Sequence, residues 1–381
     1  MIYFDNAATS YPKPPSVIRS VEDCLRNYCG NPGRGAHFLS LHSAEKIYEA
    51  RERIAQLFGS NSPENVFFTY NNTYALNMVI KGLLRAGDHV LISDMEHNSV
   101  YRPIASMADS GLIDYDVFDT FCISPVRTTE SICKSIKKLI RPNTKMLIAA
   151  HASNICSASL PLKEIGQICG AKGILFVVDA AQSAGHLPLH MEKMNIDVIC
   201  APGHKGLYGI QGCGFAILRE GVLPSPIIEG GSGVNSLISK MPELSPERFE
   251  AGTPSVPSIV ALSEGIEFVK SRGIDEIHKH ESKLYLRLTD MISSFPKVTH
   301  YAPEHIGSTL LFNISGIHCE RVADMLSKSD ICVRSGYHCS PLGHTAIGTI
   351  NAGAVRVSFS PFNTERQLDK FYSAIKYIIE C

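Results

Sequence analysis

The sequence predicts an α/β protein, with a mostly parallel sheet in a large domain and a smaller α+β domain at the C-terminal end. Three observations lead to this prediction. Short β-rich segments alternate with helical ones from about residue 65 to residue 218, a loop-forming stretch follows, and long helical segments dominate the remainder. Parallel strands need crossover connections of helical length, which produces this alternation. A chain of 381 residues is long enough for two such domains.

Six segments have the composition of strands, and helical segments lie between several of them. The run from Gly173 to Asp179 is apolar on both alternations, as expected for a strand that helices cover on both faces. The predicted strands are Val66–Thr69, His89–Ser93, Lys145–His151, Ile174–Asp179, Val198–Ala201 and Gly214–Leu218. The predicted helices between them are Tyr74–Leu84, Thr129–Ile140 and Leu162–Ala171.

A Gly-, Pro- and Ser-rich stretch, Pro224–Pro257, then interrupts the pattern and is typical of long active-site loops. Beyond it we expect helices over Ile259–Arg272, Glu276–Ser294 and Glu365–Ile379. The predicted division is a large domain of residues 16–257, and a small domain that joins residues 1–15 to residues 258–381.

The composition excludes several classes of protein. The net charge of −1 offers no attraction to nucleic acid or to an anionic membrane. No segment approaches the roughly 20 apolar residues that cross a bilayer, and the first residues lack the features of a secretory signal. The twelve cysteines form no C-x-x-C pair, and the His and Cys residues lack zinc-site spacing. We therefore expect a cytoplasmic protein without a metal, a membrane or a nucleic-acid partner.

Polar residues follow the predicted strands where each strand ends. His97 follows one strand, His151 and Asn154 follow the next, Asp179 closes another, and His204-Lys205 follows a fourth. Ligands in open α/β sheets bind beyond the carboxyl ends of the strands. The sequence thus predicts a ligand site at this edge.

Lys205 and Asp179 indicate which ligand this is. A lone lysine in a glycine-rich turn is ordinarily a surface residue. A carboxylate at a buried strand end, however, is costly unless it meets a cation. A protonated pyridine nitrogen is such a cation, and a lysine paired with an aspartate is what proteins contribute to pyridoxal 5′-phosphate (PLP) chemistry. We therefore predict a PLP enzyme with the cofactor on Lys205.

The motifs of this chain resemble those of the cysteine desulfurases, in the class V aminotransferase group of fold-type I PLP-dependent transferases. They occur in the family's order and run almost from end to end. They are Tyr3–Ser10, Gly33–Ser40, Glu96-His97, His151–Asn154, Asp179–Ser183, Gly203–Lys205, Arg248–Pro254, Val333–Cys339 and Arg356–Thr364.

The resemblance implies a role for each matching residue. Lys205 would hold PLP covalently and move protons at the substrate Cα, Asp179 would pair with the ring nitrogen, and His97 would stack on the ring. Gln182 would bond the ring hydroxyl, and Asn154 would lie beside that hydroxyl and the substrate carboxylate.

The resemblance also assigns the phosphate site. Thr73, at the start of a helix, would bind the phosphate together with Asn72 and His204. Thr253 would reach the phosphate of the other subunit, which implies a homodimer with shared active sites. The chain departs from the family at Pro202, where a Ser or Thr usually donates to the phosphate, and at Tyr74, where Glu is common.

On the substrate side, the family places a nucleophilic cysteine at Cys339, and an adjacent histidine or arginine favours the reactive thiolate. Arg356 presents a fork that matches an amino-acid carboxylate. His37 and Arg334 complete the predicted substrate-binding set.

These residues predict conversion of L-cysteine to L-alanine, with the sulfur transferred to Cys339 as a persulfide. The short span from Cys339 to Arg356 resembles the short-loop group of desulfurases, which pass sulfur to a dedicated acceptor protein. Selenocysteine lyase is the nearest alternative, with L-selenocysteine as substrate and a smaller role for Cys339. Another PLP-dependent aminotransferase or lyase is the third.

Overall fold

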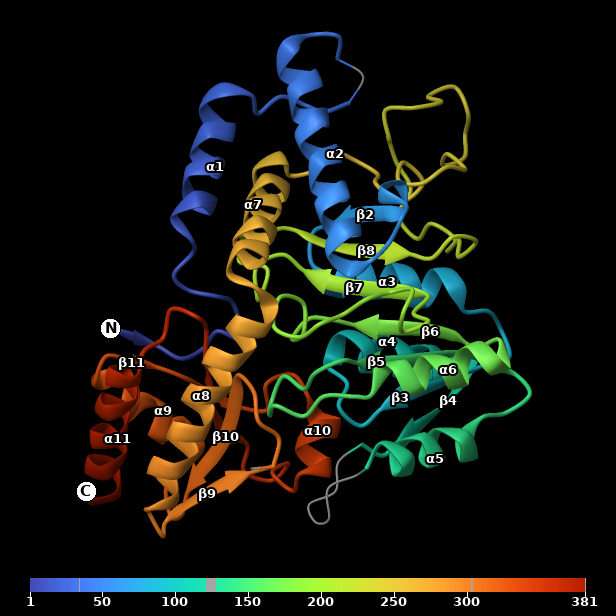
Figure 1. The fold of residues 1–381 in the computed structure, drawn as a ribbon. Helices are drawn as coiled ribbons and strands as arrows, with labels where there is room; N and C mark the ends of the chain where they lie inside the picture. Colours follow the sequence, from blue (N-terminus) through green and yellow to red (C-terminus); the bar gives the residue numbers. More distant parts are fainter. Residues whose placement is uncertain (34, 121–127, 303, 381) are drawn as a thin grey trace.

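The computed structural model describes residues 1–33, 35–120, 128–302 and 304–380. A seven-stranded sheet lies at the centre of the molecule (Figure 1), in the order β2-β8-β7-β6-β5-β3-β4. The five strands from β7 to β4 are mutually parallel, and β8 runs antiparallel to both of its neighbours. The predicted mostly parallel sheet is confirmed. The strands are β2 (Val66–Thr69), β3 (Asp88–Ser93), β4 (Ile113–Phe118), β5 (Thr144–Ala150), β6 (Leu175–Asp179), β7 (Val198–Pro202) and β8 (Gly214–Leu218).

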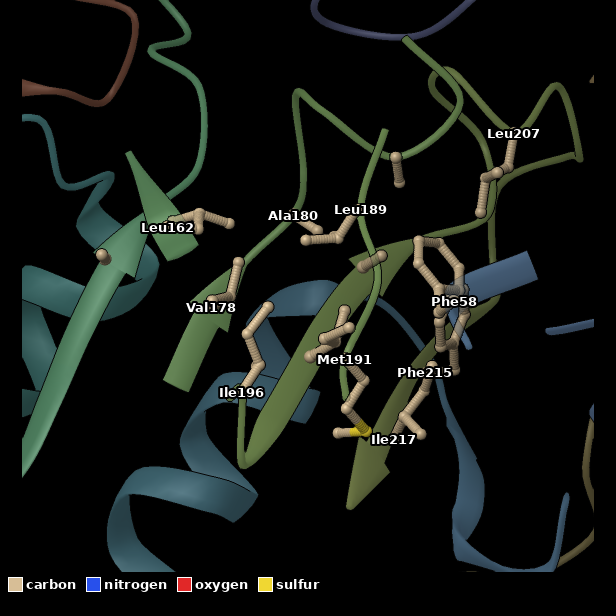
Figure 2. Close-up of a cluster of buried hydrophobic side chains, with 14 of the residues drawn as sticks. Phe58, Leu162, Val178, Ala180, Leu189, Met191, Ile196, Leu207, Phe215 and Ile217 are labelled. Carbon is tan, nitrogen blue, oxygen red and sulfur yellow. The ribbon is translucent and has the colours of Figure 1, made fainter. Parts of the chain in front are cut away.

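Helices cover both faces of this sheet. Along β6, Phe176 and Val178 pack into one apolar cluster while Val177 packs into the other, so the strand is buried on both alternations. One face lies under α2 (Phe38–Phe58), α5 (Thr129–Leu139), α6 (Leu162–Lys172) and α7 (Val256–Arg272). The other face lies under α3 (Asn72–Leu83) and α4 (Asn98–Asp109). Figure 2 shows part of the first cluster, where Phe58 of α2 packs against Phe215 of β8.

The sequence-based prediction missed β4 and α4. The β4 sequence, Ile-Asp-Tyr-Asp-Val-Phe, has charged residues at alternate positions, because β4 is the edge strand and its middle is only partly buried. Helix α4 contains Pro103, which interrupts a helical pattern. Tertiary burial of Val100, Pro103 and Ile104 nevertheless stabilises the helix.

A second, antiparallel sheet lies apart from the first, in the order β12-β13-β10-β9. Its strands are β9 (Val298–Tyr301), β10 (Thr309–Ile314), β12 (Arg334–Gly336) and β13 (Ala354–Ser358). Three helices pack with it: α8 (Ile274–Ser293), α9 (Cys319–Lys328) and α11 (Glu365–Glu380). The N-terminal strand β1 (Ile2–Tyr3) pairs with β11 (Ile331–Cys332), so Ile2 and Phe4 join the core of this C-terminal unit.

Two helices connect these units. Helix α10 (Pro341–Ala346) lies between the small sheet and the large one (Figure 1). Helix α7 packs on α1 (Pro15–Asn27) and α2, and its buried residues before Val269 belong to the large core. A 3-10 turn, Pro63–Asn65, precedes β2. The packing of α7 favours a domain boundary near Gly273; the division at residue 257 stays a prediction.

Within the described ranges, none of the helices combines the length and apolar character that a bilayer-crossing helix requires. The same ranges contain no group of three or more His, Cys, Asp or Glu residues placed to hold a metal ion.

Candidate active site

A cavity opens at the carboxyl ends of the central strands. All eight residues predicted to contact the cofactor within one chain line it: Asn72, Thr73, His97, Asn154, Asp179, Gln182, His204 and Lys205. They come from five different chain segments, which the parallel sheet brings to one edge.

Lys205 and Asp179 occupy this cavity from neighbouring strand ends. Asp179 is the last residue of β6, and its Oδ1 accepts hydrogen bonds from Asn72 Nδ2 (2.8 Å) and from the Ala181 amide (2.9 Å). Burial raises the pKa of Asp179, and both of these bonds and the charge of Lys205 oppose that rise. Burial lowers the pKa of Lys205 to about 8, against the opposing attraction of Asp179. A larger fraction of the amine is therefore neutral, and so nucleophilic, than for an ordinary lysine.

Two histidines of the cavity are neutral at physiological pH. Burial, with the nearby charge of Lys205, lowers the pKa of His97 and of His204 to about 4 each. His97 caps α4, where its Nδ1 accepts from the Ser99 amide at 3.0 Å. His204 Nδ1 lies 3.0 Å from Thr9 Oγ1. Both rings are thus oriented, and His97 has the uncharged face that stacking on a ring requires.

The first turn of α3 forms the opposite wall. The helix begins at Asn72, and the Asn71 side chain accepts from the Tyr74 amide at 3.1 Å. The first amides of a helix lack intrahelical partners and attract anions. Thr73 and Pro202 also line the cavity, so the departure at Pro202 removes a hydroxyl donor from its wall.

Gln182 and Asn154 are both engaged with protein groups. Gln182 Nε2 donates to the Ala7 carbonyl at 3.0 Å, which leaves its Oε1 available to a hydroxyl. Asn154 Nδ2 donates to the His338 carbonyl at 2.7 Å. The Asn154 carbonyl in turn accepts from Arg356 Nη1 at 2.9 Å. Asn154 therefore links the cavity to Arg356 and to the Cys339 loop, the two elements predicted to act on the substrate.

Arg356 is buried and forms an ion pair with Asp5. Its Nη2 lies 2.8 Å from Asp5 Oδ1, and Arg334 Nε lies 3.2 Å from the other carboxylate oxygen. Burial lowers the pKa of Arg356, and the charge of Asp5 opposes this. The buried Nε–H of Arg356 has no hydrogen-bond partner among the described residues. Asp5 was not predicted, although it lies in the N-terminal motif; only the fold showed that it meets both arginines.

Cys339 is exposed, on a loop that contacts the cavity wall. Its carbonyl accepts from the Asn98 amide at 2.8 Å, directly after His97. The adjacent His338 was expected to favour a thiolate. Its ring is buried, and burial together with the charge of Arg356 lowers its pKa to about 2. A neutral His338 supplies no positive charge, which leaves the arginine of that expectation, Arg334; a reactive thiolate at Cys339 stays a prediction.

Five predicted residues do not line this cavity: Arg356, Arg334 and Cys339, which belong to the hydrogen-bonded segments described above, and His37 and Thr253, which do not. His37 is exposed and caps α2, where its ring accepts from the Ser40 amide. Thr253 is exposed and lines a different hollow, together with Asn31 and Tyr48. The chain by itself does not bring either residue to Lys205.

The donor set fits PLP. A buried carboxylate and a partly neutral lysine face one cavity, a helix start supplies amides for a phosphate, and an uncharged His97 lines the same cavity. This combination of groups is what PLP enzymes provide.

The comparisons with known proteins define the class. The family model described as Aminotransferase class-V matches residues 2–371, and this chain belongs to that family. Membership in it implies the use of PLP, and the sheet described above is that of a fold-type I enzyme.

Within the family, proteins similar to this chain include cysteine desulfurases. A probable cysteine desulfurase from Methanothermobacter thermautotrophicus is 32% identical over 96% of this chain and 92% of its own length. One from Pyrococcus abyssi is 32% identical over 100% of this chain and 94% of its own. The apo structure of a cysteine desulfurase from Thermococcus onnurineus has a TM-score of 0.89 and 30% identity, covering 100% of this chain and 94% of that one.

Proposed function

We propose that this protein is a PLP-dependent cysteine desulfurase, which converts L-cysteine to L-alanine and transfers the sulfur to Cys339. The observation that carries the proposal is that the backbone at Cys339 is hydrogen-bonded to segments that line the Lys205 cavity. The Cys339 carbonyl bonds the amide that follows His97, and the carbonyl before it bonds Asn154. The loop that carries an exposed thiol is thus attached to the wall of the cavity that contains Lys205.

Each residue then has a defined task. Lys205 would hold PLP and move the proton at the substrate Cα, and Asp179 would pair with the pyridine nitrogen. Bound PLP supplies the electron sink for the carbon skeleton. Arg356 binds the substrate carboxylate, for which its unpartnered Nε–H is a free donor. His97 would stack on the cofactor ring.

The sulfur step balances without an added oxidant. The Cys339 thiolate attacks the substrate sulfur, the bond from Cβ to sulfur breaks, and Cβ takes up a proton. The products are alanine and a Cys339 persulfide. Because the Cys339 side chain is exposed, we further propose that an acceptor protein collects this sulfur there.

The test is Cys339→Ala, with Cys29→Ala as the matched control at another exposed cysteine. Alanine release from L-cysteine should fall at least about a hundredfold in Cys339→Ala, because the nucleophile acts in the transition state. PLP content should not change. Mass spectrometry of the wild type after one turnover should find the added sulfur on the Cys339 peptide. Alanine release at the wild-type rate would overturn the persulfide mechanism; retained release from L-selenocysteine alone would favour selenocysteine lyase.

We also propose a homodimer in the cytoplasm, in which Thr253 completes the phosphate site of the other subunit. Exposed apolar side chains on α2 and on the Pro224–Pro257 loops support an interface there. The most exposed of these are Phe38, Leu41, Tyr48, Leu237, Ile238 and Leu244. Sedimentation at micromolar concentration should find two chains per particle; a monomer that keeps its PLP would contradict shared sites.

A further inference from the structure

Three buried polar side chains next to the Cys339 loop are connected by hydrogen bonds, and none of them has a role in the reaction proposed above. Thr349 Oγ1 lies 2.6 Å from His344 Nδ1, and His344 Nε2 lies 3.1 Å from His338 Nδ1. His338 Nε2 lies 3.4 Å from the Arg334 carbonyl. The two imidazole rings are nearly parallel, with centroids 5.3 Å apart and planes 12° apart, as an in-plane hydrogen bond between them requires. All three side chains are buried.

One direction of the hydrogen bonds in this series satisfies the Arg334 carbonyl; the Thr349 hydroxyl also lies 3.4 Å from a second acceptor, the His344 carbonyl. The Arg334 carbonyl only accepts, so the proton of the His338 ring lies on Nε2. Burial and the charge of Arg356 lower the pKa of His338 to about 2 and that of His344 to about 4, so both rings are neutral. His338 Nδ1 is then an acceptor, and His344 Nε2 must donate to it. His344 Nδ1 therefore accepts the hydroxyl proton of Thr349.

The series of hydrogen bonds from Thr349 through His344 and His338 ends at the Arg334 carbonyl, in the backbone that leads into the Cys339 loop. Three successive contacts fix that backbone: the Arg334 carbonyl bonds the His338 ring, the His338 carbonyl bonds Asn154, and the Cys339 carbonyl bonds the Asn98 amide. His338 and Cys339 both have left-handed φ values, of 50° and 55°. Consecutive non-glycine residues adopt this conformation only where the surroundings determine it.

We infer that His344, supported by Thr349, is a positioning residue for sulfur transfer: through His338 it holds the Cys339 loop against the wall of the Lys205 cavity. The inference rests on the proposed function. His344 itself lies behind the loop and does not line the cavity. His344 acts by fixing the position of the Cys339 thiol. A displacement of about 1 Å at a reacting group can cost about a hundredfold in rate.

The main experiment compares His344→Phe with His344→Gln. Phenylalanine keeps a ring beside His338 but cannot donate or accept, whereas glutamine keeps a donor toward His338 Nδ1. Single-turnover formation of the Cys339 persulfide should slow by about tenfold or more in His344→Phe, and largely recover in His344→Gln. KM and PLP content should stay near the wild-type values, because the cavity wall is unchanged.

A control separates this effect from general destabilisation. His300, on β9, is also partly buried and bonded, 3.1 Å from Tyr285 Oη. Burial lowers its pKa to about 4 as well. His300→Phe thus removes a comparable histidine far from the loop, and should leave persulfide formation unchanged.

A second pair of variants keeps the inference testable if His344→Phe does not fold. Thr349→Val removes the hydroxyl at nearly constant volume, and Thr349→Ser keeps it. Thr349→Val should slow persulfide formation less than His344→Phe does, and Thr349→Ser should match the wild type. Equal rates in Thr349→Val, Thr349→Ser and the wild type would overturn the inference, as would a folded His344→Phe within twofold of the wild type.

A readout that does not depend on turnover distinguishes this inference from the proposed function. The Asn98 amide bonds the Cys339 carbonyl, so its hydrogen exchange reports whether the loop is docked. Exchange should be faster in His344→Phe and unchanged in His300→Phe. If the wild type forms no Cys339 persulfide, the proposed function fails; if Asn98 exchange is the same in His344→Phe as in the wild type, the positioning role fails.

Discussion

The two halves of the active site are held by different means. The cofactor half is built around residues at the ends of largely buried parallel strands, where Asp179 closes β6 and Lys205 follows β7. The sulfur half is a short loop after the three-residue strand β12, and single hydrogen bonds to its carbonyls fix it. The hydrogen bonds of the whole sheet hold the strand ends in place, whereas the position of the loop depends on each of its few hydrogen bonds. We therefore expect the cofactor half to tolerate changes around its key residues better than the sulfur half.

The largest expected effect is at Lys205. Lys205→Ala should lower kcat at least about a thousandfold, because covalent attachment and proton transfer are lost together. It should also abolish the borohydride-reducible PLP adduct, measured by peptide mass spectrometry.

Lys13 provides a matched control for that change. Burial also lowers the pKa of Lys13 to about 8, but its amine is bonded to Ser10 Oγ and to the His204 carbonyl. Lys13→Ala should keep the adduct on Lys205. Reducible PLP on Lys205→Ala would show that another lysine carries the cofactor.

Arg356 is next, because it lies between the two halves. Arg356→Lys keeps a positive charge but loses the planar fork that bonds Asn154 and Asp5. We expect kcat/KM for L-cysteine to fall about ten- to hundredfold. Arg334, which is half-exposed, should matter less. Steady-state kinetics measures both; an unchanged kcat/KM in Arg356→Lys would place the carboxylate elsewhere.

The smallest effect concerns stability where the two units join. His186 Nδ1 lies 2.9 Å from Glu281 Oε2 of α8, and both side chains are largely buried. Burial lowers the pKa of His186, but the charge and hydrogen bond of Glu281 outweigh it and raise the pKa above its usual value. A raised pKa gives stability that is complete below the unfolded value of roughly 6.5 and is lost as the pH rises through the folded value.

His186→Gln should therefore destabilise the protein by about 1 kcal/mol more at about pH 6 than at about pH 9. Urea unfolding at both pH values measures this difference. His318→Gln is the control, since His318 is exposed and 4.0 Å from Glu320. A His186→Gln effect that is the same at both pH values would mean that the pair does not titrate as described.

Much of the cofactor half can be predicted from the sequence alone. The lysine, the aspartate and their neighbours follow strands, and a parallel sheet brings strand ends together wherever the strands are recognised. Local pattern is enough here, because burial on both faces leaves a continuous apolar run such as Gly173–Asp179. Where burial is one-sided, as at the edge strand β4, the same pattern is absent and the strand was missed.

Only the tertiary structure decided how the sulfur half is arranged. His338 precedes Cys339 in the chain and was expected to favour the thiolate form of that cysteine. The His338 ring is neutral because the fold buries it against His344. Asp5 meets Arg356 across 351 positions of sequence, a pairing that no local pattern contains. Sequence determines which side chains follow a strand, since that is a matter of chain order. Burial and long-range contact determine their charge and their partners, and these exist only once the chain has folded.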